Sequence, residues 1–379
     1  MKENLDKLVS NLKERANLIL GNEKLAKWVG SVSKIVGLMI ECKIPGATIG
    51  ELCEIVTEGG EKRLAEVVGF KDDTCILLLL GAGGGLHQGS KVYPTGKTLQ
   101  VPVGPQLLGR VLDSLGNPLD GKPLKGIKER RGVDADPPEA YGRPRIDEVF
   151  STGVRAVDSL LTLGVGQRVG LFAGSGVGKS TLMGMIARYS DADVNVIALV
   201  GERGREVQDF IEESLGEEGL KKSVVIIATS DQPAMFRLKC LYTATTIAEY
   251  FRDKGKKVML MVDSVTRTAM AAREVGLSVG EPPTMKGYTP SVFAMLPRIL
   301  ERAGRSKQGS ITGIYSTLVD GDDFNEPIAD AVRGILDGHI LLSRDVAAKN
   351  HFPAINILGS VSRLFTELSD EPHKKAAGD

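Results

Sequence analysis

The chain beyond residue 150 alternates between short apolar runs and longer segments with helical spacing. The apolar runs are uniform rather than alternating, which is typical of parallel strands covered on both faces. They lie at residues 168–173, 194–200, 223–228, 258–262 and 311–318. Helices are expected at 181–189, 205–214, 240–253, 266–275 and 327–336. This order predicts an α/β domain with a mostly parallel central sheet, spanning residues 151–365.

An earlier part of the chain has a different pattern. Between Val32 and Val92, short β-rich runs alternate with glycine-bearing turns. The runs lie at residues 32–40, 51–57, 64–70 and 75–80. Closely spaced short strands of this kind predict a small β-barrel domain at residues 29–95.

The segments before and after this barrel are less regular. Residues 1–28 are expected to form an N-terminal amphipathic helix, because Leu5, Leu8 and Leu12 fall on one face. That helix could pack on its own domain or bind a partner, and the sequence leaves both open. Residues 96–150, rich in proline, glycine and charge, are expected to form a linker and the start of the α/β domain.

Composition narrows the functional classes. The 379 residues include 48 basic and 48 acidic side chains, so no overall field favours nucleic acid or an anionic membrane. The cysteines lack metal-ligand spacing, and reduced thiols in a cytosolic protein explain them most simply. The longest apolar run, 75–80, is strand-sized and too short to span a membrane. We therefore expect a cytoplasmic protein.

A glycine-rich turn follows the apolar run 168–173. It reads Ala173-Gly-Ser-Gly-Val-Gly-Lys-Ser180 and leads into a helical segment. Backbone N–H groups in such a turn can surround an anion, and the helix adds the positive end of its dipole. Lys179 would reach the outer phosphates of a nucleotide and the Ser180 hydroxyl would bind Mg²⁺. The predicted nucleotide-binding residues of the turn are Gly174, Ser175, Gly176, Val177, Gly178, Lys179, Ser180 and Thr181.

Two features of this phosphate loop leave room for other interpretations. The usual motif begins with glycine, whereas Ala173 stands at that position here. An ordinary flexible loop with a surface lysine would have a similar composition. Other motifs in the chain are therefore needed to distinguish a nucleotide-binding loop from an ordinary one.

Charged residues also follow two of the other apolar runs. Asp263 ends the run 258–262 and would hold the Mg²⁺ shell of a phosphate-loop enzyme, although it could instead cap the next helix. Glu202 follows the run 194–200 and could polarise a water for attack on the γ-phosphorus, with Arg203 stabilising charge on the phosphoryl oxygens. Alternatively, Glu202 and Arg203 could belong to a solvent-exposed cluster of charges at the start of a helix.

Several of these motifs together resemble the rotary ATPase catalytic-subunit superfamily. They are Ala173–Ser180, Gly201-Glu-Arg-Gly-Arg-Glu206, Asp263-Ser-Val-Thr-Arg267 and Pro353-Ala-Ile-Asn-Ile-Leu-Gly-Ser-Val-Ser362. Within that superfamily, Gly280-Glu-Pro-Pro-Thr-Met-Lys-Gly-Tyr288 and Asp320-Gly-Asp-Asp323 look like the flagellar and type III secretion export ATPases. Ala173 is usual in that branch. The resemblance covers nearly the whole chain.

The resemblance implies a β-barrel domain, a phosphate-loop (RecA-like) ATPase domain and a C-terminal helical domain, assembled as a homohexameric ring. It implies that Glu202 activates water and that Arg203 and Arg267 support the phosphate network. Arg363 matches the arginine finger that enters the neighbouring subunit's site. Phe352 matches an aromatic residue that stacks on adenine, although core packing beside the next proline would also account for it. Residues 366–379 would be the truncated start of the helical domain.

A function in flagellar protein export follows from the resemblance, with ATP and Mg²⁺ bound. The implied partners are regulatory and stalk subunits of the export apparatus, export substrates with their chaperones, and a membrane export gate contacted peripherally. Virulence-type secretion, or a catalytic subunit of a rotary ATP synthase or ion pump, are alternatives. An RNA-translocating motor is disfavoured, because the barrel region holds Phe70 and Tyr93 as its only aromatic residues and lacks a basic cluster.

Overall fold

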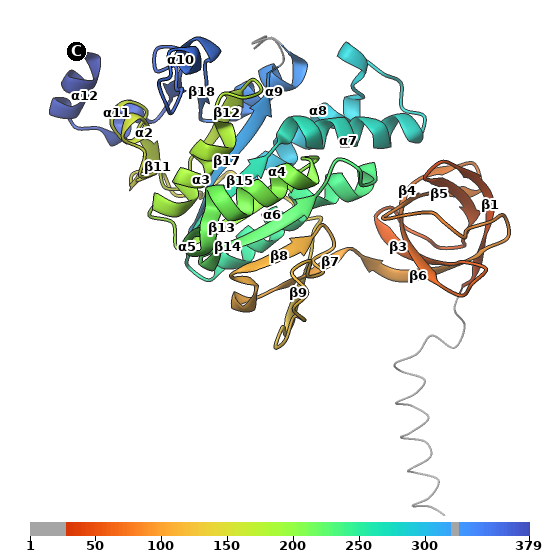
Figure 1. Cartoon of the computed structure of the whole chain (residues 1–379). Helices are drawn as coiled ribbons and strands as arrows, with labels where there is room; N and C mark the ends of the chain where they lie inside the picture. The colour runs from red at the N-terminus through yellow and green to blue at the C-terminus, as the bar shows by residue number, and fades with distance from the viewer. Residues whose placement is uncertain (1–27, 320–325) are drawn as a thin grey trace, which may run out of the picture. The chain divides into compact units, whose positions relative to one another are not determined.

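The structure is a computed structural model that describes residues 28–319 and 326–379. It divides into two compact units, one containing Gly83–Gly96 and the chain before Leu80, the other containing Leu80–Ala82 and Lys97–Asp379 (Figure 1). The helix predicted over residues 1–28 lies outside the described residues, apart from Trp28.

The first unit contains a closed six-stranded β-barrel, as predicted. Its strands are β1 (Gly30–Val36), β2 (Met39–Lys43), β3 (Glu51–Val56), β4 (Lys62–Lys71), β5 (Thr74–Leu79) and β6 (Lys91–Thr98), in the order β1-β2-β5-β4-β3-β6. The run expected over 32–40 is two strands, because Gly37 turns the chain with a φ of 60°. The last strand, β6, was not predicted, since it is mostly exposed and lacks an apolar pattern.

The second unit is built on a nine-stranded sheet. Its main strand order is β19-β18-β12-β17-β15-β13-β14-β8, with β16 paired to β17. The strands are β8 (Arg110–Asp113), β12 (Arg168–Ala173), β13 (Val194–Val200), β14 (Ser223–Ala228), β15 (Lys257–Asp263), β16 (Gly304–Arg305), β17 (Ser310–Leu318), β18 (Gly338–Leu341) and β19 (Val361–Ser362). From β18 to β8 every pairing along the main order is parallel. The predicted parallel core is therefore confirmed, with β19 and β16 as antiparallel additions.

Helices cover both faces of this sheet (Figure 1). They are α2 (Arg155–Leu160), α3 (Lys179–Tyr189), α4 (Gly204–Asp209), the π-helical turn η2 (Phe210–Leu215), α5 (Gly216–Lys221), α6 (Ala234–Asp253), α7 (Val265–Ser278), α8 (Pro290–Leu300), α9 (Pro327–Ile335), α10 (Arg344–Ala348), α11 (Phe365–Leu368) and α12 (Glu371–Gly378). Along β13, Val196 and Ala198 pack with α6 to α9, whereas Ile197 and Leu199 pack with α3 and η2. Both faces are buried, which explains why the strand sequence is uniformly apolar.

The stretch expected as a linker, 96–150, is more structured than predicted. It supplies β8, the edge strand of the large sheet, and the hairpin-like pair β7 (Gln100–Val103) and β9 (Glu129–Gly132). The stretch also holds the 3₁₀ turn η1 (Pro105–Leu107), and its last strand, β10 (Val149–Phe150), pairs with β11 (Leu163–Gly164). A second 3₁₀ turn, η3 (Met285–Gly287), lies later in the chain. These strands are only two to four residues long, so their local patterns are weak.

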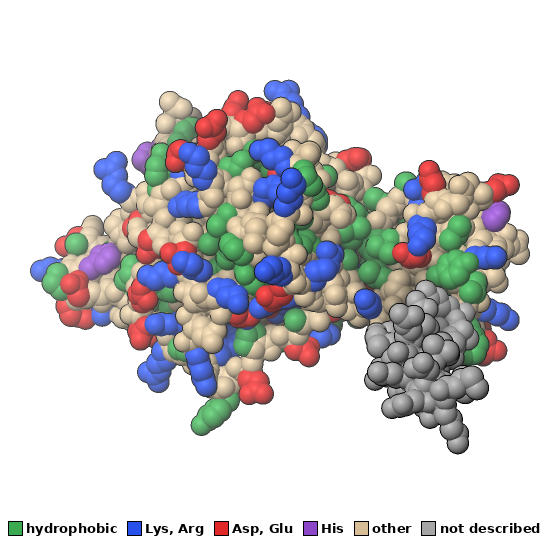
Figure 2. Space-filling model, turned by 90° about the horizontal axis from the view of Figure 1, so that it is seen from below, with side chains coloured by type: hydrophobic (Ala, Val, Ile, Leu, Met, Phe, Trp, Pro, Cys, Tyr) green, Lys and Arg blue, Asp and Glu red, His purple; other side chains and the backbone are tan. Residues whose placement is uncertain are grey.

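Charged side chains of both signs are interspersed on the face shown in Figure 2. On that face neither sign forms a continuous field, in line with the equal numbers of basic and acidic residues in the chain. None of the helices in the described residues combines the length and the apolar character needed to cross a membrane.

Candidate active site

The phosphate loop connects the buried strand β12 to α3, at the carboxyl edge of the parallel strands. Gly176 and Gly178 have φ values of 78° and 86°, which residues with a side chain rarely adopt. The turn therefore requires glycine at these two positions. Helix α3 begins at Lys179 directly after it, so the N–H groups of the first helical turn lie at the loop.

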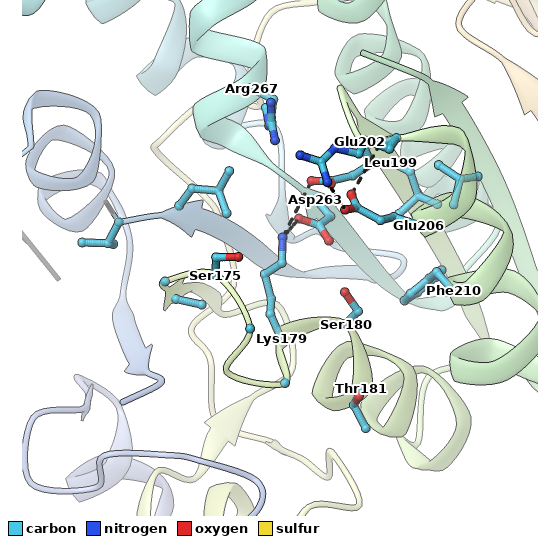
Figure 3. Close-up of a pocket in the computed structure, with 18 residues that line it drawn as sticks. Ser175, Lys179, Ser180, Thr181, Leu199, Glu202, Glu206, Phe210, Asp263 and Arg267 are labelled. Atoms are coloured by element: carbon cyan, nitrogen blue, oxygen red, sulfur yellow. Dashed lines mark hydrogen bonds and ion pairs between the residues drawn. The ribbon is translucent and has the colours of Figure 1, made fainter. Parts of the chain in front are cut away.

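A cavity of about 480 Å³ opens beside this loop (Figure 3). The residues that were predicted for the site and that line the cavity are Gly174, Ser175, Gly176, Gly178, Lys179, Ser180, Thr181, Glu202, Arg203, Asp263 and Arg267. They come from the ends of three parallel strands, β12, β13 and β15, and from the helices that follow. Segments far apart in sequence thus converge on one cavity, as expected for this class of sheet.

The centre of the site is an ion pair between Lys179 and Asp263. Lys179 Nζ donates to Asp263 Oδ1, which also accepts a hydrogen bond of 2.8 Å from Ser316 Oγ. The Asp263 side chain is 4% exposed and that of Lys179 is 12% exposed, so both charges are largely removed from water. The alternative role of Asp263 as a helix cap is wrong, because the Ser264 side chain caps α7 by accepting from the Arg267 N–H.

Glu202 lies beside this pair (Figure 3). Its Oε1 is 3.9 Å from Lys179 Nζ, and its side chain is 14% exposed. Burial, followed by the negative charge of Asp263, raises the pKa of Glu202 to about 7, although Lys179 acts in the opposite direction. A hydrogen bond between the two carboxyl groups lowers the pKa of Glu206, so that Glu202 is the one that holds a shared proton.

The two arginines near Glu202 differ in their surroundings. The Arg203 side chain is 81% exposed and pairs with Glu206 at 3.5 Å, at the start of α4. Arg267 projects from the first turn of α7, and its Nε is buried without a hydrogen-bond partner among the described residues. Glu202 Oε1 is also buried without a hydrogen bond. Two residues of opposite charge that line one cavity and carry polar atoms without hydrogen-bond partners indicate a place for a polar ligand.

Three predicted residues are not among those that line the cavity. The Val177 side chain is buried in the apolar core, so this residue contributes to the loop through its backbone. Phe352 is 56% exposed, and its ring packs beside the loop at Gly178. Arg363 is exposed and follows β19; its N–H donates to the Asp337 carbonyl, and its Nη2 is 3.5 Å from the Arg333 carbonyl oxygen.

Two polar residues at the site were not predicted from the sequence. Ser316 reaches Asp263 because β17 runs parallel to β15, with Tyr315 opposite Val262. A polar residue near the end of the apolar run 311–318 was the available signal. Glu206 belongs to the motif 201–206 and lies in the first turn of α4, which begins two residues after Glu202, so its side chain can reach Glu202.

Comparison with known proteins agrees with this architecture. Residues 153–362 match the nucleotide-binding domain of the ATP synthase alpha/beta family, and residues 32–96 match the β-barrel domain of the same family. A flagellum-specific ATP synthase of Bacillus subtilis (strain 168) is 58% identical over 353 residues, covering 93% of this chain and 81% of that protein. A type 3 secretion system ATPase of Xanthomonas euvesicatoria is 50% identical over 369 residues, covering 97% of this chain and 82% of that protein.

Solved structures show the same fold. The assembled ATPase EscN of the enteropathogenic E. coli type III secretion system matches with a TM-score of 0.86 and 47% identity, over 92% of this chain and 84% of that one. EscN in complex with its central stalk EscO matches with a TM-score of 0.85. With both domains matched in order and relatives this similar over most of their length, the chain belongs to the ATP synthase alpha/beta family.

Proposed function

We propose that this chain hydrolyses Mg-ATP and thereby drives protein export through a flagellar export apparatus. The observation that carries the proposal is the convergence of Lys179, Glu202 and Asp263 on the cavity beside the phosphate loop. Relatives with flagellar names and relatives with type III secretion names both match at high identity, so virulence-type secretion is the second candidate.

The phosphate loop would bind the triphosphate through its backbone N–H groups and through Lys179. Glycine at 176 and 178 permits the curled backbone that such a cradle needs, and α3 contributes its positive end. The ion pair with Asp263 keeps the Lys179 ammonium at the edge of the cavity, ready to contact phosphate oxygens. Arg267 also lines the cavity, and its Nε, which has no hydrogen-bond partner among the described residues, would be a further donor.

The residues present suit a Mg²⁺ ion bound together with nucleotide. Within residues 28–319 and 326–379, no cluster of three or more His, Cys, Asp or Glu side chains could hold a metal by itself. Mg²⁺ sites in nucleotide enzymes use one or two protein oxygens plus phosphates, and Ser180 and Asp263 both line the cavity. When bound, the ion would neutralise charge on the phosphate oxygens.

Glu202 is the residue placed to activate water. Its side chain lines the cavity and is 14% exposed, and its Oε1 accepts no hydrogen bond from the described residues, so the carboxyl group would be available to a water in the cavity. A general base acts best with a pKa near the working pH, and the pKa of Glu202 is about 7. Arg203, with its exposed side chain at the rim, would contribute charge stabilisation to the phosphoryl group.

A pH dependence follows from this assignment. Only ionised Glu202 can accept a proton, so kcat/KM for ATP should rise with pH through about 7 and level off above it. Glu206→Gln removes a hydrogen bond that raises the pKa of Glu202, so the rising limb should move to lower pH. Glu212→Gln, at an exposed carboxylate of η2, serves as the control and should not move the limb. A limb in the same place in Glu206→Gln enzyme would contradict the coupling.

We also propose that the chain works as a homohexameric ring, with Arg363 of one subunit acting in the site of the next. The exposed position of Arg363, outside the residues that line its own cavity, supports an action in trans. The assembled EscN structure and its stalk complex support a ring with a central stalk partner. Regulatory subunits, chaperones with their export substrates and a membrane export gate would then be contacted from the cytoplasm.

The direct test of the proposed function is phosphate release from ATP by purified protein. The chain should release phosphate with Mg²⁺ present and stop when the metal is chelated. Lys179→Ala should be inactive because the outer phosphates lose their cationic partner. Phosphate release that is unaffected by the chelator or by Lys179→Ala would refute the assigned site. Deleting the gene in its bacterium then separates the two candidates, since motility is lost in one case and effector secretion in the other.

A further inference from the structure

Two segments leave the sheet side by side at the phosphate loop. Strands β12 and β18 are parallel neighbours, with Phe172 opposite Leu341, and Leu342 N donates to the Phe172 carbonyl at 2.8 Å. The phosphate loop continues from β12, and α10 continues from β18. The first residue of α10, Arg344, is therefore brought next to the first glycine of the loop, Gly174.

The Arg344 guanidinium lies directly against Gly174. A Cβ built onto Gly174 would be 2.8 Å from Arg344 Nη2, 3.0 Å from Nε and 3.2 Å from Cζ. Three atoms of one planar group at nearly the same distance mean that the guanidinium faces the glycine rather than touching it with one tip. A side chain at position 174 would require the guanidinium to shift, since real Cβ atoms essentially never lie as close as the 2.8 Å to Nη2.

The same segment touches the other end of the loop. Phe352 follows α10, and its Cδ1 and Cε1 would be 3.5 Å and 3.7 Å from a Cβ on Gly178, an ordinary contact distance. Residues 344–352 thus contact both the entry and the exit of the glycine turn. The loop is held between an arginine at one end and an aromatic ring at the other.

We propose that Arg344 is a positioning residue that fixes the phosphate loop in its nucleotide-binding conformation. The inference rests on the proposed function, because it concerns ATP binding at the same cavity. A guanidinium is planar and always charged, so it both limits movement of the Gly174 peptide and adds positive charge beside the phosphate-binding N–H groups. The guanidinium would stabilise bound ATP equally in the ground state and in the transition state of hydrolysis. Its loss should therefore raise the Kd and KM for ATP and leave kcat nearly unchanged.

Two different substitutions test this contact. Arg344→Ala removes the guanidinium, and Gly174→Ala displaces it with a methyl group at a position whose backbone is outside the left-handed region. Each should raise the Kd for Mg-ATP by about tenfold. The Kd of the double variant should not exceed the larger of the two single-variant values, because both substitutions disrupt the same interaction. Lys349→Ala, at an exposed cation that follows α10, is the matched control and should bind ATP normally.

Binding is measured with a fluorescent ATP analogue, KM and kcat by phosphate release, and folding by the melting temperature without nucleotide. Normal binding in either single variant would overturn the inference, as would effects that multiply in the double variant. A loss of kcat at unchanged KM would also overturn it. Failure of the wild-type chain to bind ATP would instead contradict the proposed function. The failure of the inference and the failure of the proposed function are therefore distinguishable.

Discussion

Arg363→Ala should lower the turnover of Mg-ATP by about three to five orders of magnitude, the range typical of a transition-state arginine. The side chain is exposed, and the hydrogen bond of its guanidinium, to the Arg333 carbonyl, is long at 3.5 Å. Little local stability depends on it, so the variant should fold and bind nucleotide as the wild type does. Phosphate release at saturating ATP measures the effect.

Mixing two inactive variants separates action in trans from action within one chain. Lys179→Ala protein retains Arg363, and Arg363→Ala protein retains the phosphate loop. In mixed rings some interfaces pair an intact loop with an intact arginine, so part of the activity should return. Arg333→Ala, in which the arginine beside Arg363 is replaced but Arg363 is kept, is a control that should stay active. If no activity returns at concentrations where the mixture forms rings, the shared site is refuted.

Glu202→Gln should reduce turnover by roughly two to four orders of magnitude, the usual contribution of a positioned general base. The amide is nearly the same size as the carboxyl group but cannot accept the proton of an attacking water. Nucleotide affinity should stay close to the wild-type value, because the phosphate loop and Lys179 are unchanged. Phosphate release and ATP binding measured on one preparation check both statements.

The matched control for this variant is Glu212→Gln, at an exposed carboxylate on the π-helical turn that follows α4. It makes the same chemical change away from the cavity and should retain wild-type turnover. Full activity in Glu202→Gln protein would show that another group activates water. A parallel loss of ATP binding would show that the carboxylate organises the pocket rather than acting as a base.

The parallel core could be predicted because each of its long strands is buried on both faces. A strand such as β13, buried at all seven residues, produces a mostly apolar run rich in β-branched residues, and its length is that of a strand rather than a helix. The shorter strands β8 and β18 could not be identified, since four residues give too little pattern. Helix α8 was also missed, although Pro290 at its first turn is a known helix-start signal.

The phosphate loop was predictable because its chemistry is local in sequence. Glycine at 176 and 178, followed by Lys179 at the helix start, is a pattern that a single short stretch of sequence displays in full. The partners of Asp263 were not predictable in the same way. The approach of Ser316 to Asp263 depends on the register of β15 and β17, which a single sequence does not specify.

The contact between Arg344 and Gly174 has the same origin. These residues are 170 positions apart, and only the pairing of β12 with β18 brings them together. Arg363 and Phe352 were assigned from family resemblance alone, and the Arg363→Ala and mixing experiments test the role of Arg363.

The central claim is that one subunit binds ATP and its neighbour completes hydrolysis. It is tested most directly by measuring wild-type specific activity over a wide range of protein concentration, with sedimentation of the same samples with and without a nonhydrolysable nucleotide. Activity per subunit should rise in step with the fraction of assembled rings. A specific activity that stays constant while the protein changes from single chains to rings would contradict the claim.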